Sequence, residues 1–231
     1  MITPVVADMA HFNTVDFHKI AAAGIVGVIH KATQGLGVVD HQYAPRRALA
    51  VQAGLLWGAY DFATGDNAVA NAKQFLGMAS PDDATLVCLD FEDNAKSPMS
   101  GQQAHDFMDA VDQAIGRACW IYGGNRIFEH VTPLCQNSSA MADFFSRHPL
   151  WLCQYKTGLP DGISLDDLNK HIRIPAPWKA YSLLQYTGDG VGPKPHSVDG
   201  LEQGADLNAF DGEVDELKAI WAGTAFAAAA P

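Results

Sequence analysis

Residues 86–93 read LVCLDFED, an apolar run that ends in acidic residues. Residues 85–89 predict a short buried strand. Side chains two positions apart on a strand point to the same side, so Asp90 and Glu92 share one face with Cys88. Strand geometry places the Cβ atoms of the two acids roughly 6–7 Å apart. Alone, the pattern is also typical of a strand that runs into a solvated loop.

Paired carboxylates have a chemical use. Each raises the proton affinity of the other, so that one stays protonated while its neighbour is ionised. Glycoside hydrolysis requires these two states, an acid for the leaving oxygen and a negative charge for the developing oxocarbenium ion. The short spacing of Asp90 and Glu92 favours retention of configuration.

Strand and helix signals alternate along the first half of the chain, which is typical of a parallel sheet with helical crossovers. Helices are expected from Thr14, a plausible N-cap, to Gly24, and at 41–53, 67–78, 100–115, 140–146 and 211–221; residues 156–179 show no long helix. We predict eight strands, at 5–8, 25–32, 55–62, 85–89, 118–122, 150–155, 180–187 and 204–208.

Eight strands with helices after the first five favour an irregular TIM-like α/β barrel, (β/α)5(β)3, in a single domain over residues 1–222. A doubly wound open sheet is the alternative, but no Gly-rich phosphate loop follows the first strand. Residues 223–231 are a low-complexity tail.

Composition excludes several classes of partner. The 231 residues include 15 Lys and Arg against 26 Asp and Glu, and the net charge of −11 argues against nucleic acid and anionic membranes. No stretch approaches the ~20 apolar residues of a membrane span. The N-terminus lacks the basic and apolar regions of a signal peptide.

Neither a metal nor a cofactor is expected, because the four cysteines lack CxxC spacing. Buried free thiols are favoured, with one disulfide left open.

Polar residues recur where the predicted strands end, and parallel barrels carry their active sites at that edge. Acids come from three strands there, accompanied by aromatic side chains on which sugar C–H faces pack. The residues at this edge are Asp8, Lys31, Tyr60, Asp90, Glu92, Tyr122, Tyr155 and Asp206.

Seven segments in order resemble glycoside hydrolase family 25, the Chalaropsis-type lysozymes, over about residues 5–215. Each is a weak signal alone, but their order is specific, and the family fold is a barrel of five β/α units followed by three strands. The segments are VAD (6–8), IHKATQG (29–35), GAYDF (58–62), LDFED (89–93), LWLCQY (150–155), LQYT (184–187) and DLNAF (206–210).

The resemblance implies a muramidase that cuts the β-1,4 bond between N-acetylmuramic acid and N-acetylglucosamine in peptidoglycan. Glu92 matches the proton donor, and Asp90 matches the carboxylate that stabilises the intermediate. Asp8 and Asp206 match acids of the site floor. Tyr60 and Tyr122 match substrate-contacting tyrosines, while Lys31 either holds a site carboxylate or neutralises Asp8.

Four positions depart from the family pattern and put the substrate contacts in question. The family usually has Ser at position 10, Glu at 34, His at 61 and Trp at 184. This chain has Ala10, Gln34, Asp61 and Leu184.

Two other functions stay open at this point: a non-catalytic barrel that binds peptidoglycan or chitin, and a glycosidase that acts on chitin-like glycans. The expected partner is the glycan strand, with the protein a monomer made in the cytoplasm. It would reach the wall after release, as a phage endolysin, or by specialised export, as a toxin with a dedicated inhibitor protein.

Overall fold

Eight strands of the described residues form a closed barrel, in the order β1-β9-β8-β7-β6-β5-β4-β2 with β2 paired back to β1. The computed structural model describes residues 1–221 and 223, so the predicted tail lies, apart from Gly223, outside the described residues. The strands are β1 (Val6–Met9), β2 (Gly27–Gln34), β3 (Val38–Val39), β4 (Leu56–Phe62), β5 (Leu86–Asp90), β6 (Trp120–Gly123), β7 (Leu150–Cys153), β8 (Leu183–Thr187) and β9 (Asp206–Ala209).

The barrel is parallel except around its last strand. β9 pairs antiparallel with both β1 and β8. The sequence predicts all eight barrel strands within a few residues, and the irregular barrel is confirmed. It does not predict β3, a two-residue strand that folds back antiparallel on the end of β2.

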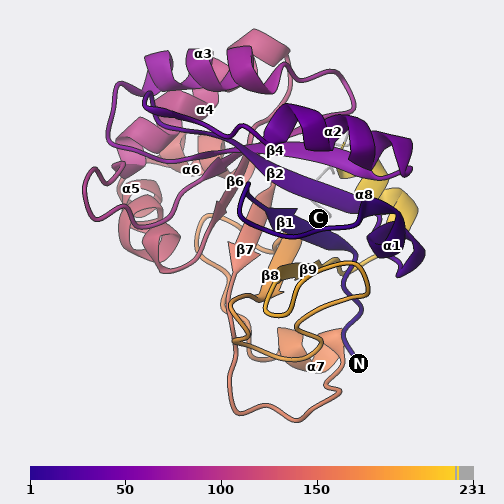
Figure 1. The fold of residues 1–231 in the computed structure, drawn as a ribbon. Coiled ribbons are helices and arrows are strands. Elements are labelled where there is room, and N and C mark those ends of the chain that lie inside the picture. The colour runs from indigo at the N-terminus through magenta and orange to yellow at the C-terminus, as the bar shows by residue number, and fades with distance from the viewer. Residues whose placement is uncertain (222, 224–231) are drawn as a thin grey trace.

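The helices lie around the first part of the barrel, where they connect parallel strands (Figure 1). After β7 the connection carries only a five-residue helix, and its loops extend beyond the barrel below β7 and β8 in this view. The helices are α1 (Phe17–Ala22), α2 (Tyr43–Gln52), α3 (Ala68–Ala79), α4 (Gly101–Ile115), the π-helix η1 (Ile127–Val131), α5 (Thr132–Asn137), α6 (Ser139–Ser146), α7 (Leu165–Asn169) and α8 (Val214–Trp221).

Helix starts follow local side-chain chemistry. Ser100 caps α4 in a capping box with Gln103, so that two otherwise unpaired backbone N–H groups are satisfied. The start predicted at Thr14 is wrong. Val15 instead forms an isolated bridge with Leu201, which keeps this segment extended, and the side chain of Asp16 caps α1.

The barrel interior is filled by side chains from alternate strand positions, including Ile29, Leu86, Trp120 and Trp151. Trp221 of α8 joins this cluster, and its indole N–H donates to the carbonyl of Trp57 at 2.9 Å. Each buried large apolar side chain contributes about 1.5–3 kcal/mol to folding. The core therefore fills one end of the barrel and leaves polar side chains at the other.

The structure also shows the state of the four cysteines and one tightly packed glycine. All four cysteines are free thiols, and Cys153 is the one that is not fully buried. A Cβ atom at Gly58 would lie 3.1 Å from Cγ1 of Ile29, which explains the glycine in β4.

No helix within the described residues has the length and apolar character needed to cross a membrane.

Candidate active site

The strand ends converge on one cavity of about 210 Å³. Strand register places the contributing residues level with one another: Asp8 is opposite Asp206, Lys31 opposite Tyr60, and Asp90 opposite Tyr122. All seven residues predicted for the site line this cavity, namely Asp8, Lys31, Tyr60, Asp90, Glu92, Tyr122 and Asp206. The structure thus brings together side chains that are up to 198 positions apart in the chain.

The alternation predicted for β5 is present. Cys88 packs in the barrel interior and Asp90 and Glu92 line the cavity, whereas Leu89 and Phe91 pack in the outer core between barrel and helices. Asp90 is 5% exposed, and its Oδ1 atom has no hydrogen-bond partner among the described residues. An unpaired buried carboxylate oxygen is costly and marks a place for a donor from a ligand.

The four acids of the cavity all have raised pKa values. Burial, followed by the charge of Asp8, raises the pKa of Glu92 to about 6. Burial also raises the pKa of Asp8 to about 6 and that of Asp206 to about 8. Burial and then the charges of Glu92 and Asp8 raise the pKa of Asp90 well above its usual range. The free site therefore holds protons at neutral pH, shared among interacting carboxyl groups.

Gln185 of β8 organises the floor of the cavity, and sequence reasoning did not select it. Its Nε2 donates to Oδ1 and Oδ2 of Asp8 at 3.0 and 2.9 Å. Its Oε1 accepts from the hydroxyls of Tyr122 at 2.7 Å and Tyr155 at 2.5 Å. A polar residue inside the apolar strand 180–187 was the available signal, because position 185 alternates onto the barrel interior.

Asn208 of β9 is the second residue that sequence reasoning missed. Its Nδ2 donates to Oδ2 of Asp8 at 2.8 Å, and its Oδ1 accepts from the indole N–H of Trp151 at 2.6 Å. Asp8 is thus held by two amide side chains, and the hydrogen bonds oppose the effect of burial on its pKa. Trp151 packs in the core and also lines the cavity.

Tyr122 links this network to the acid pair. Its hydroxyl also lies 3.5 Å from Oε1 of Glu92, and this hydrogen bond lowers the pKa of Glu92 against the effect of burial. Its ring packs on that of Trp151 with centroids 4.4 Å apart. The tyrosine is therefore fixed in position on two sides.

Lys31 is the cation of the cavity. Its Nζ donates to Oε1 of Gln34 at 2.6 Å and lies 5.0 Å from the ring centroid of Phe62. Among the described residues it forms no ion pair with Asp8, which is one of the two roles predicted for it. The acid it most affects is Asp90, whose raised pKa it opposes.

The four departures from the family pattern fall in different surroundings. Ala10 lines the cavity and Gln34 holds Lys31, so these two lie at the site. Leu184 is buried in the outer core. Asp61 is buried away from the cavity, where it accepts from Thr33 Oγ1 at 2.6 Å.

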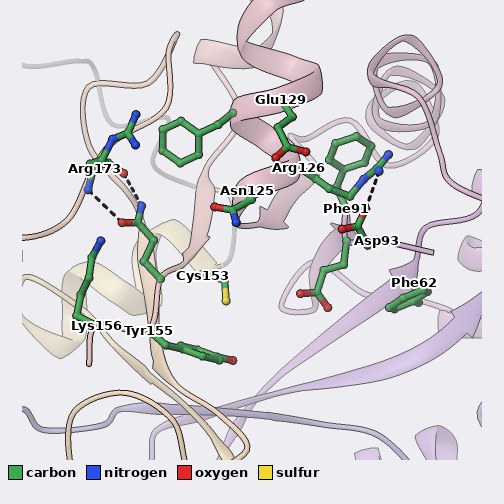
Figure 2. Close-up of a pocket in the computed structure, with 14 residues that line it drawn as sticks. Phe62, Phe91, Asp93, Asn125, Arg126, Glu129, Cys153, Tyr155, Lys156 and Arg173 are labelled. Carbon is green, nitrogen blue, oxygen red and sulfur yellow. Dashed lines mark hydrogen bonds and ion pairs between the residues drawn. The ribbon is translucent and has the colours of Figure 1, made fainter. Parts of the chain in front are cut away.

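A larger groove of about 870 Å³ (Figure 2) adjoins the cavity, since Phe62 and Glu92 are among the lining residues of each. Tyr155 forms part of it, together with residues that sequence reasoning did not select. Those residues are Phe91, Asp93, Gly124, Asn125, Arg126, Phe128, Glu129, Cys153, Gln154, Lys156 and Arg173. Glu92 therefore lies between a small acidic cavity and a larger groove, and lines both.

No group of three or more His, Cys, Asp or Glu side chains within the described residues is arranged to hold a metal ion.

Comparison with known proteins gives consistent matches. The sequence model described as glycosyl hydrolases family 25 matches residues 7–194. The uncharacterized protein YegX of Escherichia coli K12 is 27% identical over 195 residues, which are 82% of this chain and 61% of YegX. The chain thus spans about three fifths of the length of the curated relatives it matches.

Solved structures share the fold. The bacterial lysozyme from Streptomyces coelicolor superposes with a TM-score of 0.75 at 23% identity, over 96% of this chain and 99% of that one. A family GH25 lysozyme from Aspergillus fumigatus has a TM-score of 0.72 at 26% identity, over 96% and 100%.

Proposed function

This chain belongs to glycosyl hydrolase family 25, and on that premise we propose that it is a peptidoglycan hydrolase of the muramidase type. It cuts the β-1,4 bond between N-acetylmuramic acid and N-acetylglucosamine. Its similarity to the Aspergillus fumigatus lysozyme supports the substrate class. The observation that carries the proposal is the placement of Asp90 and Glu92 on one face at the end of β5, in a cavity that opens into a groove.

Glu92 is the general acid. With a pKa of about 6 it holds a proton over much of the weakly acidic range, and it stands where cavity and groove meet. It gives this proton to the glycosidic oxygen as the C1–O bond breaks, and the bonding electron pair leaves with that oxygen. Glu92 then accepts a proton from the water that attacks C1.

Asp90 stabilises the positive charge at the sugar. In the proposed mechanism the carbonyl oxygen of the substrate's own N-acetyl group forms a bond to C1. The carboxylate of Asp90 accepts a hydrogen bond from the amide N–H of the same group. The unpaired Oδ1 of Asp90 supports this role, because a substrate N–H satisfies an oxygen that has no partner in the free site. Two displacements at C1 retain the configuration.

Asp90 acts as an anion, yet burial favours its protonated form in the free site. Lys31 opposes this effect, and the positive charge that develops on the sugar favours ionisation further. The proton of Asp90 is released to solvent when the substrate binds and the sugar gains positive charge. Lys31 thus favours the ionised form of Asp90 that the proposed mechanism requires.

Digestion of purified peptidoglycan tests the function. Glu92→Gln removes the proton donor with little change in shape, and release of new reducing ends should fall by about a thousandfold or more. Asp90→Asn should lose nearly as much. Glu213→Gln, an exposed glutamate at the start of α8, is the matched control and should keep full activity.

Two readouts complete the test. Mass analysis should find N-acetylmuramic acid at the new reducing ends, and proton NMR of the first product should show the β anomer. Near-normal lysis by a folded Glu92→Gln variant contradicts the assignment, as does glycan binding by the wild type without new reducing ends.

A further inference from the structure

Two cationic side chains that the proposed chemistry does not use line the groove beside Glu92. Lys156 follows β7, and Arg173 lies in the segment that precedes β8. Figure 2 shows both on the same side of the groove, across from Arg126 and Asp93. No ion pair in the described part of the chain includes either of the two cations.

Arg173 is held in place by its backbone and by its guanidinium. The backbone N–H of Arg173 donates to Oε1 of Gln154 at 3.2 Å, and its backbone carbonyl accepts from Nε2 of the same glutamine at 2.6 Å. The guanidinium lies 5.1 Å from the ring centroid of Phe128. The backbone N–H of Gln154 in turn donates to the backbone carbonyl of Gln185. The barrel therefore anchors the backbone of Arg173, and the exposed guanidinium lies against one ring of the groove.

The other charges of the groove leave these two cations available. Arg126 already donates to Asp93 at 2.8 Å and to the carbonyl of Met99, so its charge is used within the protein. Glu129 is an acid of the groove and forms no ion pair within the described residues. In a chain of net charge −11, unpaired cations on one wall mark a site for an anion.

We propose that Lys156 and Arg173 bind a carboxylate carried on a side branch of the glycan, so that the groove selects strands with carboxylates over neutral ones. This inference rests on the proposed function. Each muramic acid carries a lactyl ether, whose carboxyl group is either free or amide-linked to a peptide with carboxylates of its own. A guanidinium and an ammonium together provide charge-assisted hydrogen bonds to such a group. Polymers of N-acetylglucosamine lack it, and chitin is therefore a poor substrate.

Kinetics on soluble glycan strands test the proposal. The double variant Lys156→Gln/Arg173→Gln removes both charges, and Lys73→Gln/Lys218→Gln removes two exposed charges outside the groove as a matched control. One substrate keeps its stem peptides, and the other is first treated with an amidase that leaves free lactyl carboxylates. We expect the groove variant to raise KM about tenfold with kcat within about twofold of wild type. Added salt should raise the KM of wild type and of the control more than that of the groove variant.

The two substrates identify the carboxylate. A rise in KM on peptide-bearing strands alone assigns the bound carboxylate to the stem peptide. A rise on amidase-treated strands alone assigns it to the lactyl group. A rise on both substrates shows that Lys156 and Arg173 accept either carboxylate. Unchanged KM on both substrates, or equal changes in groove variant and control, overturns the proposal.

The design separates this proposal from the proposed function. Wild-type protein that releases no reducing ends from either substrate contradicts the muramidase function alone. In that case, titration of the same two strands into wild type and the groove variant still tests whether Lys156 and Arg173 bind the glycan. Equal affinities of the two proteins overturn the proposal. Unfolding curves confirm that the variants compared are folded.

Discussion

The side chain of Gln185 donates to both carboxylate oxygens of Asp8, at 3.0 and 2.9 Å, across a sequence separation of 177 residues. The same amide accepts hydrogen bonds from two tyrosine hydroxyls on its other side. One neutral residue thus fixes an acid of the cavity floor and the tyrosine that contacts Glu92. Gln185 therefore connects Asp8 with the tyrosine whose hydroxyl lies 3.5 Å from Oε1 of Glu92.

Gln185→Leu should destabilise both the fold and the site. The substitution leaves Asp8 with fewer donors and leaves two tyrosine hydroxyls without their acceptor inside the barrel. We expect the free energy of unfolding to fall by about 2–4 kcal/mol and kcat to fall at least about tenfold. Urea denaturation and initial rates measure the two effects. Gln113→Leu, at an exposed position of α4, is the control and should change neither; a Gln185→Leu variant as stable and active as wild type argues against this role.

Two substitutions should move the pH profile in opposite directions. In the proposed mechanism Glu92 acts in its protonated form, so activity should fall as pH rises through its pKa of about 6. Tyr122→Phe removes a hydrogen bond that lowers this pKa, and the falling limb should move to higher pH. Asp8→Asn removes a negative charge that raises the pKa, and the limb should move to lower pH. The dependence of kcat/KM on pH between pH 4 and 9 measures both shifts. If the falling limbs of the two variants move in the same direction, the role of Glu92 is contradicted.

Lys31 should matter through the charge of Asp90. Lys31→Met removes the cation that favours ionised Asp90, so the pKa of Asp90 rises and less of the active anion is present at a given pH. We expect kcat at pH 6 to fall below that of wild type, and the ratio of variant to wild-type kcat to recover in part as pH rises. Lys31→Arg keeps the charge and should retain most of the activity at pH 6. Equal activity of the Met and Arg variants at that pH excludes an electrostatic role.

Asp61 should make stability depend on pH. Its folded-state pKa of about 7 lies above its ordinary value of 3.8, so the folded state keeps a proton that the unfolded chain releases. Between these pH values the free energy of unfolding falls as pH rises, by at most about 4 kcal/mol from this group. Asp61→Asn cannot titrate, so the variant should lose less stability between pH 4 and 8.

Thermal unfolding of Asp61→Asn across this range is the measurement, with the exposed Asp83→Asn as control. In wild type Nδ2 of Asn71 donates to Oδ2 of Asp61 at 3.1 Å. A flip of the Asn71 amide would present its unpaired Oδ1 to the amide of the new asparagine. A variant whose stability falls with pH as steeply as that of wild type refutes the assignment to Asp61.

The limits of sequence reasoning are visible in particular residues. Ser100 begins its helix as predicted, because a capping box requires only four consecutive residues. Asp16, rather than Thr14, begins α1, because a bridge from Val15 to the distant Leu201 keeps the preceding segment extended. The strand β3 was missed for a similar reason, since two exposed valines form it only by pairing with β2.

The sequence by itself determined that Asp90 and Glu92 share a face, because the two-residue period of a strand is a local property of the backbone. It also determined where the barrel strands lie along the chain, through apolar runs and the turns between them. Only the tertiary structure decided which partners the acids meet. Barrel closure through the antiparallel pairings of β9 brings Gln185 and Asn208 to Asp8, and burial there raises the pKa values. Partner choice and burial depend on segments far apart in the chain, and no local pattern contains them.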